Sequence, residues 1–200
     1  MKNFKIRFKN KTLEIVNLED YGFLVEPRYY FYGWSNLKSC YARFSVAKRL
    51  LFAKKYLPKG YNFKIWDSFR TKETQKLLRR SFRKRLENLH PEWDSKKILE
   101  ALNVFTGSPV WKVKKIRLTG HFFGGAVDLT IVNKQGEELD MGTDFDDITE
   151  RAALHYFKDK RSLNRQEKAV KKSRRLLSKV MKKAGFKSYP AEWWHWSYNK

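Results

Sequence analysis

Two short segments in the second half of the chain constrain the fold most. The stretch GHFFGGAVD (120–128) holds His121 and Asp128, and the stretch AEWWHWSYNK (191–200) holds Glu192 and His195. Two imidazoles and a carboxylate can hold one Zn²⁺ and leave a fourth position for water, and a second carboxylate can move protons. More than sixty residues separate the two segments. We therefore expect a fold whose main task is to bring them together.

The local sequence of each segment supports such a meeting. His121 and Asp128 are seven residues apart, so a straight strand would place them on opposite faces. Two intervening glycines allow the chain to turn, and a strand that begins near Asp128 would give this carboxylate a rigid base. Glu192 and His195 are three apart, which is same-face spacing in a helical turn or bend. Either pair by itself is also typical of ordinary packing, such as a surface histidine among tryptophans.

Composition bounds the class of protein. The 200 residues are 42% hydrophobic and 16% aromatic, enough for one domain with a real core, which excludes a disordered chain. The net charge of +23 favours polyanionic partners, although a solvated basic surface is the simpler interpretation. The single cysteine, Cys40, excludes an intramolecular disulfide. The first residues lack the apolar region of a signal peptide, and no run is apolar enough to span a bilayer, so we expect a cytoplasmic protein.

Periodicity predicts a mixed fold. Apolar residues at helical spacing, with capping residues and breakers, predict helices at 42–57, 71–90, 95–105 and 164–184. Alternating apolar residues predict a hairpin or two edge strands within 3–17, strands at 61–69 and 126–132, and a last extended segment around Trp194. Residues 20–40 are aromatic without a period and predict a packed irregular loop. Because no regular βαβ rhythm appears, we expect a single α+β domain with a small antiparallel sheet and helices packed around it.

Two further groups of residues carry chemistry. Arg70 ends the strand YNFKIWDSF, where a guanidinium can point into a cleft and stabilise an oxyanion, although a surface arginine is common in so basic a chain. The stretch LDMGTDFDD (139–147) gathers carboxylates but lacks the register of a calcium-binding EF-hand loop. It can hold a cationic ammonium group, or it can be an acidic surface loop.

Taken in order, these motifs resemble a known family. The succession DSFR, GHFFGGAVDLT, DMGTDFDD and EWWH is similar to the D-alanyl-D-alanine dipeptidases. These are a branch of the zinc D,D-peptidases, which include D,D-carboxypeptidases, phage endolysins and the hedgehog signalling domain. HxxGxAxD followed by ExWH is specific for the superfamily, and DMGTDFDD favours the dipeptidase branch. The resemblance implies a catalytic domain over residues 21–200, with residues 1–20 as an N-terminal extension of the same domain.

The resemblance also implies roles for the residues that match. His121, Asp128 and His195 would bind one Zn²⁺ per chain. Glu192 would be the general base for the zinc-bound water and then the general acid, and Arg70 would stabilise the transition state. The implied substrate is the small D-alanyl-D-alanine dipeptide, which would be hydrolysed to two D-alanines.

The same comparison of motifs implies substrate contacts and also reveals where this chain departs from the family. Asp146 would meet the substrate ammonium, with Asp144 as a rival, and Thr119 stands where the family usually has a serine. The family reads YRP where this chain reads FRT. Phe122 and Phe123 replace the small and polar residues usual after the histidine. We therefore expect the pocket of this protein to differ from its relatives at these phenylalanines.

Other functions compete with this interpretation. A D,D-carboxypeptidase or endolysin acting on peptidoglycan stem peptides belongs to the same superfamily, and the basic charge suits an anionic wall polymer. A nucleic-acid-binding module built on the basic helices would not require the four motifs, so no specific nucleic acid partner is expected. Intact Glu192 and Arg70 argue against a relative that has lost activity. The sequence leaves open the oligomeric state and the physiological role, whether resistance, wall recycling or use of D-alanine.

Overall fold

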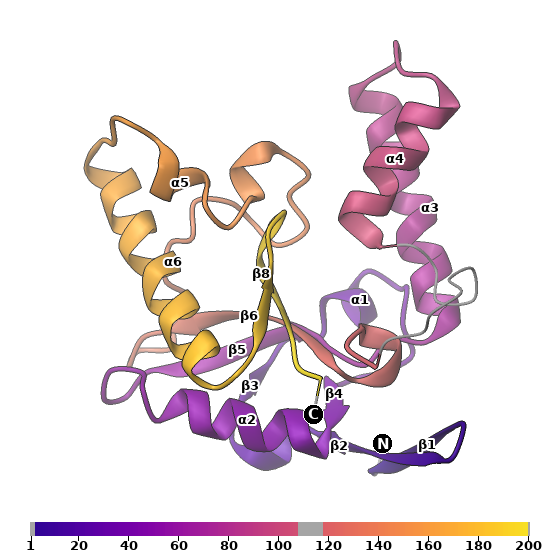
Figure 1. The fold of residues 1–200 in the computed structure, drawn as a ribbon, viewed down its shortest axis with the longest axis vertical. Coiled ribbons are helices and arrows are strands. Elements are labelled where there is room, and N and C mark those ends of the chain that lie inside the picture. Colours follow the sequence, from indigo (N-terminus) through magenta and orange to yellow (C-terminus); the bar gives the residue numbers. More distant parts are fainter. Residues whose placement is uncertain (1–2, 108–117, 200) are drawn as a thin grey trace.

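The computed structural model describes residues 3–107 and 118–199, which fold around a five-stranded sheet (Figure 1). The strand order is β3–β5–β6–β8–β7, and every neighbouring pair is antiparallel except β3 and β5. The strands are β3 (Leu24–Val25), β5 (Asn62–Asp67), β6 (Ala126–Val132), β7 (Lys187–Tyr189) and β8 (Glu192–Ser197). The predicted α+β fold with a small antiparallel sheet is confirmed, with one parallel pair added at its edge.

A second sheet holds the first residues of the chain. Strands β1 (Phe4–Phe8) and β2 (Lys11–Asn17) form the hairpin that was expected within residues 3–17. Strand β2 also pairs with β4 (Tyr41–Arg43), so the hairpin is hydrogen-bonded to a segment of the main domain. The N-terminal residues are thus built into the fold and cover one side of it.

The helices begin where the sequence offers caps. The long ones are α2 (Phe44–Lys54), α3 (Lys72–Leu89), α4 (Ser95–Thr106) and α6 (Arg165–Lys183). The Thr71 hydroxyl accepts a hydrogen bond from the backbone N–H of Thr74, and Asn164 forms a capping box with Glu167. These caps confirm the helix starts expected at residues 71 and 164. None of the helices among the described residues is long and apolar enough to cross a membrane.

The structure corrects the expectation of an irregular loop over residues 20–40. This segment contains the 3-10 turn η1 (Glu19–Tyr21), strand β3 and the short helix α1 (Arg28–Phe31). Helix α2 also begins two residues later than the predicted residue 42, because Ala42 pairs with Val16 in the second sheet. The secondary structure of this region is therefore set by pairing with distant strands and not by local periodicity.

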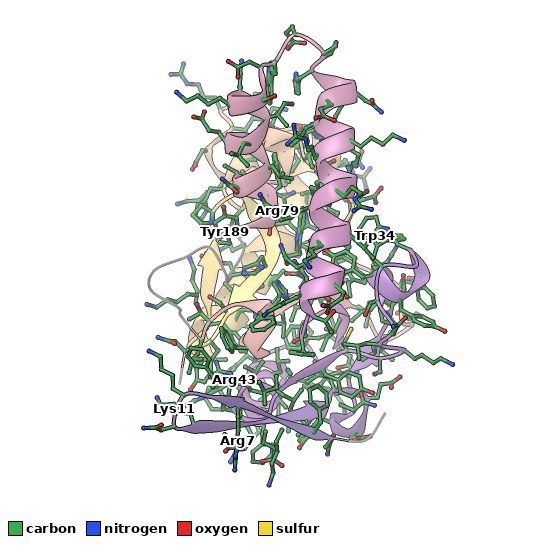
Figure 2. The ribbon with its side chains drawn as sticks, turned by 90° about the vertical axis from the view of Figure 1, so that its right-hand side faces the viewer. Arg7, Lys11, Trp34, Arg43, Arg79 and Tyr189 are labelled. Carbon is green, nitrogen blue, oxygen red and sulfur yellow. The ribbon has the colours of Figure 1, made fainter. Side chains whose placement is uncertain are left out.

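The core lies between the five-stranded sheet and the helices. All seven residues of β6, the central strand, are buried, and Trp193, Trp194 and Trp196 of β8 are buried with them. Helices α3 and α4 project from the body as a two-helix arm (Figure 1). Figure 2 shows Arg79 between the two helices of this arm and Tyr189 beside its base. The base of the arm and the sheet together enclose the site described next.

Candidate metal centre and active-site cleft

Adjacent strands of the main sheet place Asp128 beside His195. Asp128 on β6 is the direct partner of His195 on β8, and Asp67 on β5 is its partner on the other side. A register shift between Ile65 and Asp67 places Asp67 next to Asp128, in line with His195 across the three strands. The Oδ1 atom of buried Asp128 lies 3.0 Å from Nδ1 of His195. Central strands of a sheet thus hold both side chains in place.

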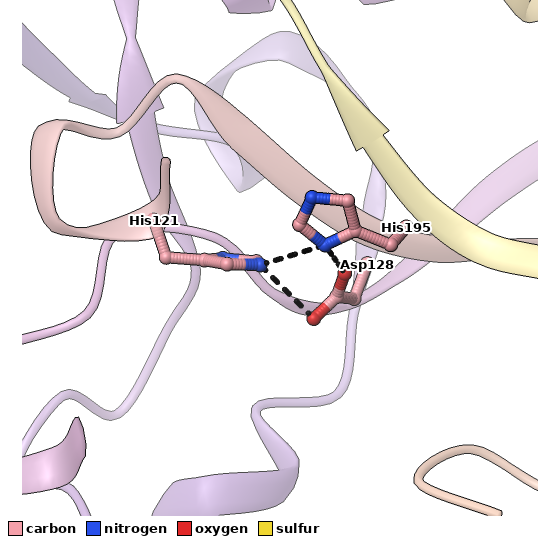
Figure 3. Close-up of side chains that lie close together, drawn as sticks. All are labelled: His121, Asp128 and His195. Carbon is pink, nitrogen blue, oxygen red and sulfur yellow. Dashed lines mark hydrogen bonds and ion pairs between the residues drawn. The ribbon is translucent and has the colours of Figure 1, made fainter. Parts of the chain in front are cut away.

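His121 reaches the same point from a tight turn. It begins the 3-10 turn η3 (His121–Phe123), which ends at Gly124 with φ +60° and whose chain then enters β6. A Cβ atom at Gly125 would lie 2.1 Å from the carbonyl oxygen of Leu118, so only glycine fits there. The turn expected from the two glycines is confirmed. As a result, Nε2 of His121 lies 3.1 Å from Nδ1 of His195 and 3.3 Å from Oδ2 of Asp128 (Figure 3).

This set of donors fits a zinc ion. Four ligands at the usual 2.0–2.1 Å around Zn²⁺ are about 3.3 Å from one another, close to the three separations in the triad. The Nδ1 atom of His121 lies 2.6 Å from the carbonyl oxygen of Ser68, which fixes the proton on Nδ1 and leaves Nε2 free to bind a metal. His121, Asp128 and His195 are the group of metal-ligating side chains found among the described residues. The donor types and their orientation both suit zinc.

The three side chains of the triad shift one another's pKa values. Burial lowers and the Asp128 carboxylate raises the pKa of His121, to a net value of about 9. Burial raises the pKa of Asp128, but the His121 cation outweighs it and holds this pKa well below its ordinary value. Burial lowers the pKa of His195. The metal-free site therefore holds a proton on His121 at neutral pH, next to carboxylates that attract a cation.

Glu192 stands beside the triad. Its Oε2 atom lies 3.9 Å from Nδ1 of His195, so the carboxylate adjoins the three donor atoms without being one of them. Burial and the negative charges of Asp128 and Asp146 raise the pKa of Glu192 well above its usual range. Both residues lie in strand β8, with Glu192 as its first residue, which confirms the extended segment expected around Trp194. A carboxylate with a raised pKa in this place suits proton transfer.

Arg70 is buried at the edge of the same site. Its Nε and Nη2 atoms donate to Oδ2 of Asp67 at 3.1 and 2.8 Å, and Nη2 lies 3.6 Å from Oδ2 of Asp128. Its Nη1 atom donates to Gln75 at 2.9 Å, and the Gln75 amide donates to the carbonyl oxygen of Thr106 at 2.8 Å. Arg70 is therefore a fixed positive charge that points into the site, held by β5 and by the base of the arm.

A cleft of about 270 Å³ joins these residues to Asp146. The Tyr29 hydroxyl donates to Oδ1 of Asp146 at 3.2 Å, whereas Oδ2 has no hydrogen-bond partner among the described residues. Burial and the charge of Asp128 raise the pKa of Asp146 to about 7. Asp144 and Thr119 do not line this cleft. Asp144 is exposed and lines a larger neighbouring cavity, so only one of the three predicted substrate residues faces the site.

Several residues of the site were not singled out from the sequence. Asp67 binds both Arg70 and His121, whose Nδ1 atom lies 3.0 Å from its Oδ2. It stands in the DSFR motif, so an acidic residue three before the arginine was the available signal. Tyr29 lies 4.9 Å from Arg70 as a cation–π partner, and it comes from the aromatic segment that carried no pattern. These residues orient the predicted ones.

Comparisons with known proteins identify the family of this chain. A family model described as D-ala-D-ala dipeptidase matches residues 34–200. D-alanyl-D-alanine dipeptidases of two Enterococcus species are similar to this chain. That of Enterococcus faecium is 29% identical over 155 residues, 76% of this chain and 70% of the relative. That of Enterococcus faecalis is 30% identical over 138 residues, 68% of this chain and 62% of the relative.

A D-alanyl-D-alanine dipeptidase of Synechocystis is 35% identical over a shorter stretch of 81 residues. That match spans 38% of this chain and 33% of the length of the relative. The family model, in contrast, covers the triad, Glu192 and Arg70 together. The chain therefore belongs to the D-ala-D-ala dipeptidase family of metallopeptidases.

Proposed function

We propose that this chain is a zinc-dependent dipeptidase that hydrolyses D-alanyl-D-alanine to two D-alanines. The observation that carries the proposal is the meeting of His121, Asp128 and His195 beside Glu192 in one small cleft. Family membership supports the same reaction class. The N-terminal hairpin and the region matched by the family are proposed to act as one domain.

Zinc and Glu192 would have different roles in the hydrolysis. A zinc ion held by His121, Asp128 and His195 would supply Lewis acidity, which lowers the pKa of a water molecule to roughly 7 and polarises the scissile carbonyl. The Glu192 carboxylate takes a proton from the attacking water and then delivers it to the nitrogen of the leaving D-alanine. The raised pKa of Glu192 supports this role, because the group must hold the proton between the two steps.

Arg70 stabilises the developing negative charge. Its guanidinium is anchored by Asp67 and Gln75, so it does not need to reorganise as the carbonyl oxygen becomes an oxyanion. Losing one such donor typically costs about 3–4 kcal/mol of transition-state stabilisation. The contact of Nη2 with Asp128 keeps this positive charge next to the reacting centre.

Asp146 binds the substrate ammonium. Its Oδ2 atom is buried and lacks a partner among the described residues, which suits pairing with a cation. The cleft volume of about 270 Å³ fits a dipeptide better than a longer chain, and a carboxylate at one end supports recognition of a free amino terminus. Asp144 and Thr119 have weaker support, since neither lines the cleft.

A substrate panel tests the proposal. Zinc-loaded protein is incubated with D-alanyl-D-alanine, with its N-acetylated form, with a tripeptide that ends in D-alanyl-D-alanine and with peptidoglycan sacculi. We expect D-alanine release from the free dipeptide alone, because its ammonium belongs to the residue at the scissile bond and can reach Asp146 within the cleft. The N-acetylated form has no ammonium, and the tripeptide carries it one residue further from the scissile bond. Comparable release from the tripeptide or from sacculi would support the D,D-carboxypeptidase or endolysin alternative. Near-normal release in Glu192→Gln would contradict the assignment of Glu192 as the general base.

A further inference from the structure

A basic groove lies between α5 (Tyr156–Asp159) and α6, away from the cleft. Its volume is about 570 Å³, and six of its ten lining residues are lysine or arginine. None of the described residues that line it is acidic, and it shares no residue with the cleft. Figure 1 shows α5 and α6 on the opposite side of β8 from the α3–α4 arm. A ligand in this groove would therefore leave the cleft open.

The cations of the groove differ in what they already bind. Arg174 donates to three backbone carbonyls and belongs to the fold, and Nζ of Lys171 donates to the carbonyl oxygen of Lys158. In contrast, no ion pair or hydrogen bond within the described part of the chain occupies the side chains of Arg175, Lys179 and Lys182. These exposed charges remain available to a partner.

Four cations of α6 form a row along the groove. Lys171, Arg175 and Lys179 are spaced four residues apart on α6, which is about 6 Å of helix rise, and Lys182 continues the row. The opposite face of α6 carries buried residues such as Val170 and Leu177, which fixes the orientation of the row. Lys158 adds a charge on the α5 wall. A single extended chain with an anion at each repeat can contact these charges in turn.

The groove favours backbone charge over bases. A phosphodiester carries its charge in the backbone, on two oxygens that face opposite sides, so one group can meet cations on both walls. Single-stranded nucleic acids bind where successive bases stack on several rings. Phe157 is only 1% exposed, so among the described residues that line the groove the His155 imidazole is the one exposed ring, and it cannot hold bases in succession. We propose that this groove binds one strand of a linear, base-free polyphosphodiester through charge alone.

Binding of defined oligomers tests this proposal independently of peptidase activity. The probes are a fluorescent abasic phosphodiester oligomer, an oligothymidylate and an oligoglutamate of equal length and charge, followed by fluorescence anisotropy. We expect equal affinity for the abasic and thymidylate oligomers and weaker binding of oligoglutamate. The logarithm of the affinity should fall with the logarithm of salt concentration with a slope of about −3, from about 0.7 for each of four phosphates.

A matched pair of double variants locates the site. Arg175→Glu/Lys179→Glu reverses two charges in the groove, and Arg80→Glu/Lys84→Glu makes the same change at the same spacing on exposed positions of α3. We expect the groove variant to lose about tenfold or more in affinity at low salt and the α3 variant to change less than about twofold. Circular dichroism checks that both fold.

Three results would overturn the proposal. Equal losses in both double variants would mean diffuse attraction to the net charge of +23. Clearly tighter binding of the thymidylate than of the abasic oligomer would indicate a nucleic-acid site. Equal binding of oligoglutamate would show that the groove does not select phosphodiesters.

Discussion

The Nε2 atom of His121 and the Nδ1 atom of His195 lie 3.1 Å apart, although 74 positions separate the two residues in the chain. A glycine turn fixes the first ring and the central strand pair β6–β8 fixes the second. Asp128 lies within hydrogen-bonding distance of the second ring and completes a buried triad. Fixed donors of this kind suit a metal that requires a defined tetrahedral arrangement.

Replacing Glu192 with glutamine separates chemistry from metal binding. We expect Glu192→Gln to lower kcat by about 10³ or more while one zinc ion stays bound, because the side chain moves protons and is not among the triad atoms. The measurements are D-alanine release and zinc content by atomic absorption. Near-normal activity would contradict the assignment of the base. Loss of zinc would make Glu192 a ligand instead.

Zinc affinity should depend on pH through His121. Its pKa of about 9, raised from 6.5, means that the metal-free fold gains stability from protonated His121 below about pH 6.5 and loses it as pH rises through 9. Zinc must displace this proton, so its affinity should rise about tenfold per pH unit between these values. Competition with a chelating dye measures it. An affinity that is flat over this range would contradict the coupling.

The Asp146 carboxylate should lower the stability of the protein, although it is needed to bind the substrate. Its pKa is raised from 3.8 to about 7, so the folded state holds the proton more tightly, and stability falls as pH rises across this interval. In zinc-free protein above pH 7, Asp146→Asn should therefore raise the free energy of unfolding, on the order of 2–4 kcal/mol, and show no gain near pH 4. Urea unfolding at both pH values checks this.

The same variant should bind the dipeptide poorly. We expect KM to rise about tenfold or more, because asparagine cannot pair with an ammonium as a charge. Asp144→Asn is the matched control, since Asp144 is exposed and outside the cleft. A larger KM effect in the control would transfer the ammonium contact to Asp144.

The N-terminal hairpin should support the turn that carries His121. The Phe8 ring contacts the Phe123 ring edge-on at a centroid distance of 4.8 Å, and Phe123 belongs to η3. Phe8→Ala should cost roughly 1–3 kcal/mol of stability and weaken zinc binding, because the ligand turn loses its packing. Phe31→Ala, at an exposed ring, is the control. Unchanged zinc affinity in Phe8→Ala would confine the hairpin to a stabilising role.

Local signals explain what the sequence predicted about the fold. Capping residues and breakers marked α3 and α6 closely, because Thr71 and Asn164 bind the first turns of their own helices. Strands β3 and β4 were missed, since they are two and three residues long and depend on partners elsewhere in the chain. No periodicity can develop over so few residues.

The residues of the site also fall into those that the sequence could predict and those that it could not. The grouping of His121, Asp128 and His195 beside Glu192 could be predicted because motif spacing and a family resemblance point to these residues, and the structure brings their side chains together. The roles of Asp67 and Tyr29 could not be predicted, since they depend on a register shift in β5 and on packing across the cleft. Phe122 and Phe123, where this chain departs from the family, have different places in the structure. Phe122 lines the cleft, whereas Phe123 packs beneath the hairpin.

Zinc titration of the metal-free protein tests the central claim most directly. Protein stripped with a chelator is mixed with increasing Zn²⁺, and D-alanine release from D-alanyl-D-alanine is followed alongside bound zinc. The account predicts that activity rises in proportion to bound zinc and saturates at one ion per chain, and that His121→Ala and His195→Ala lose both zinc and activity. Full activity in the stripped protein, or unchanged zinc stoichiometry in both variants, would contradict it.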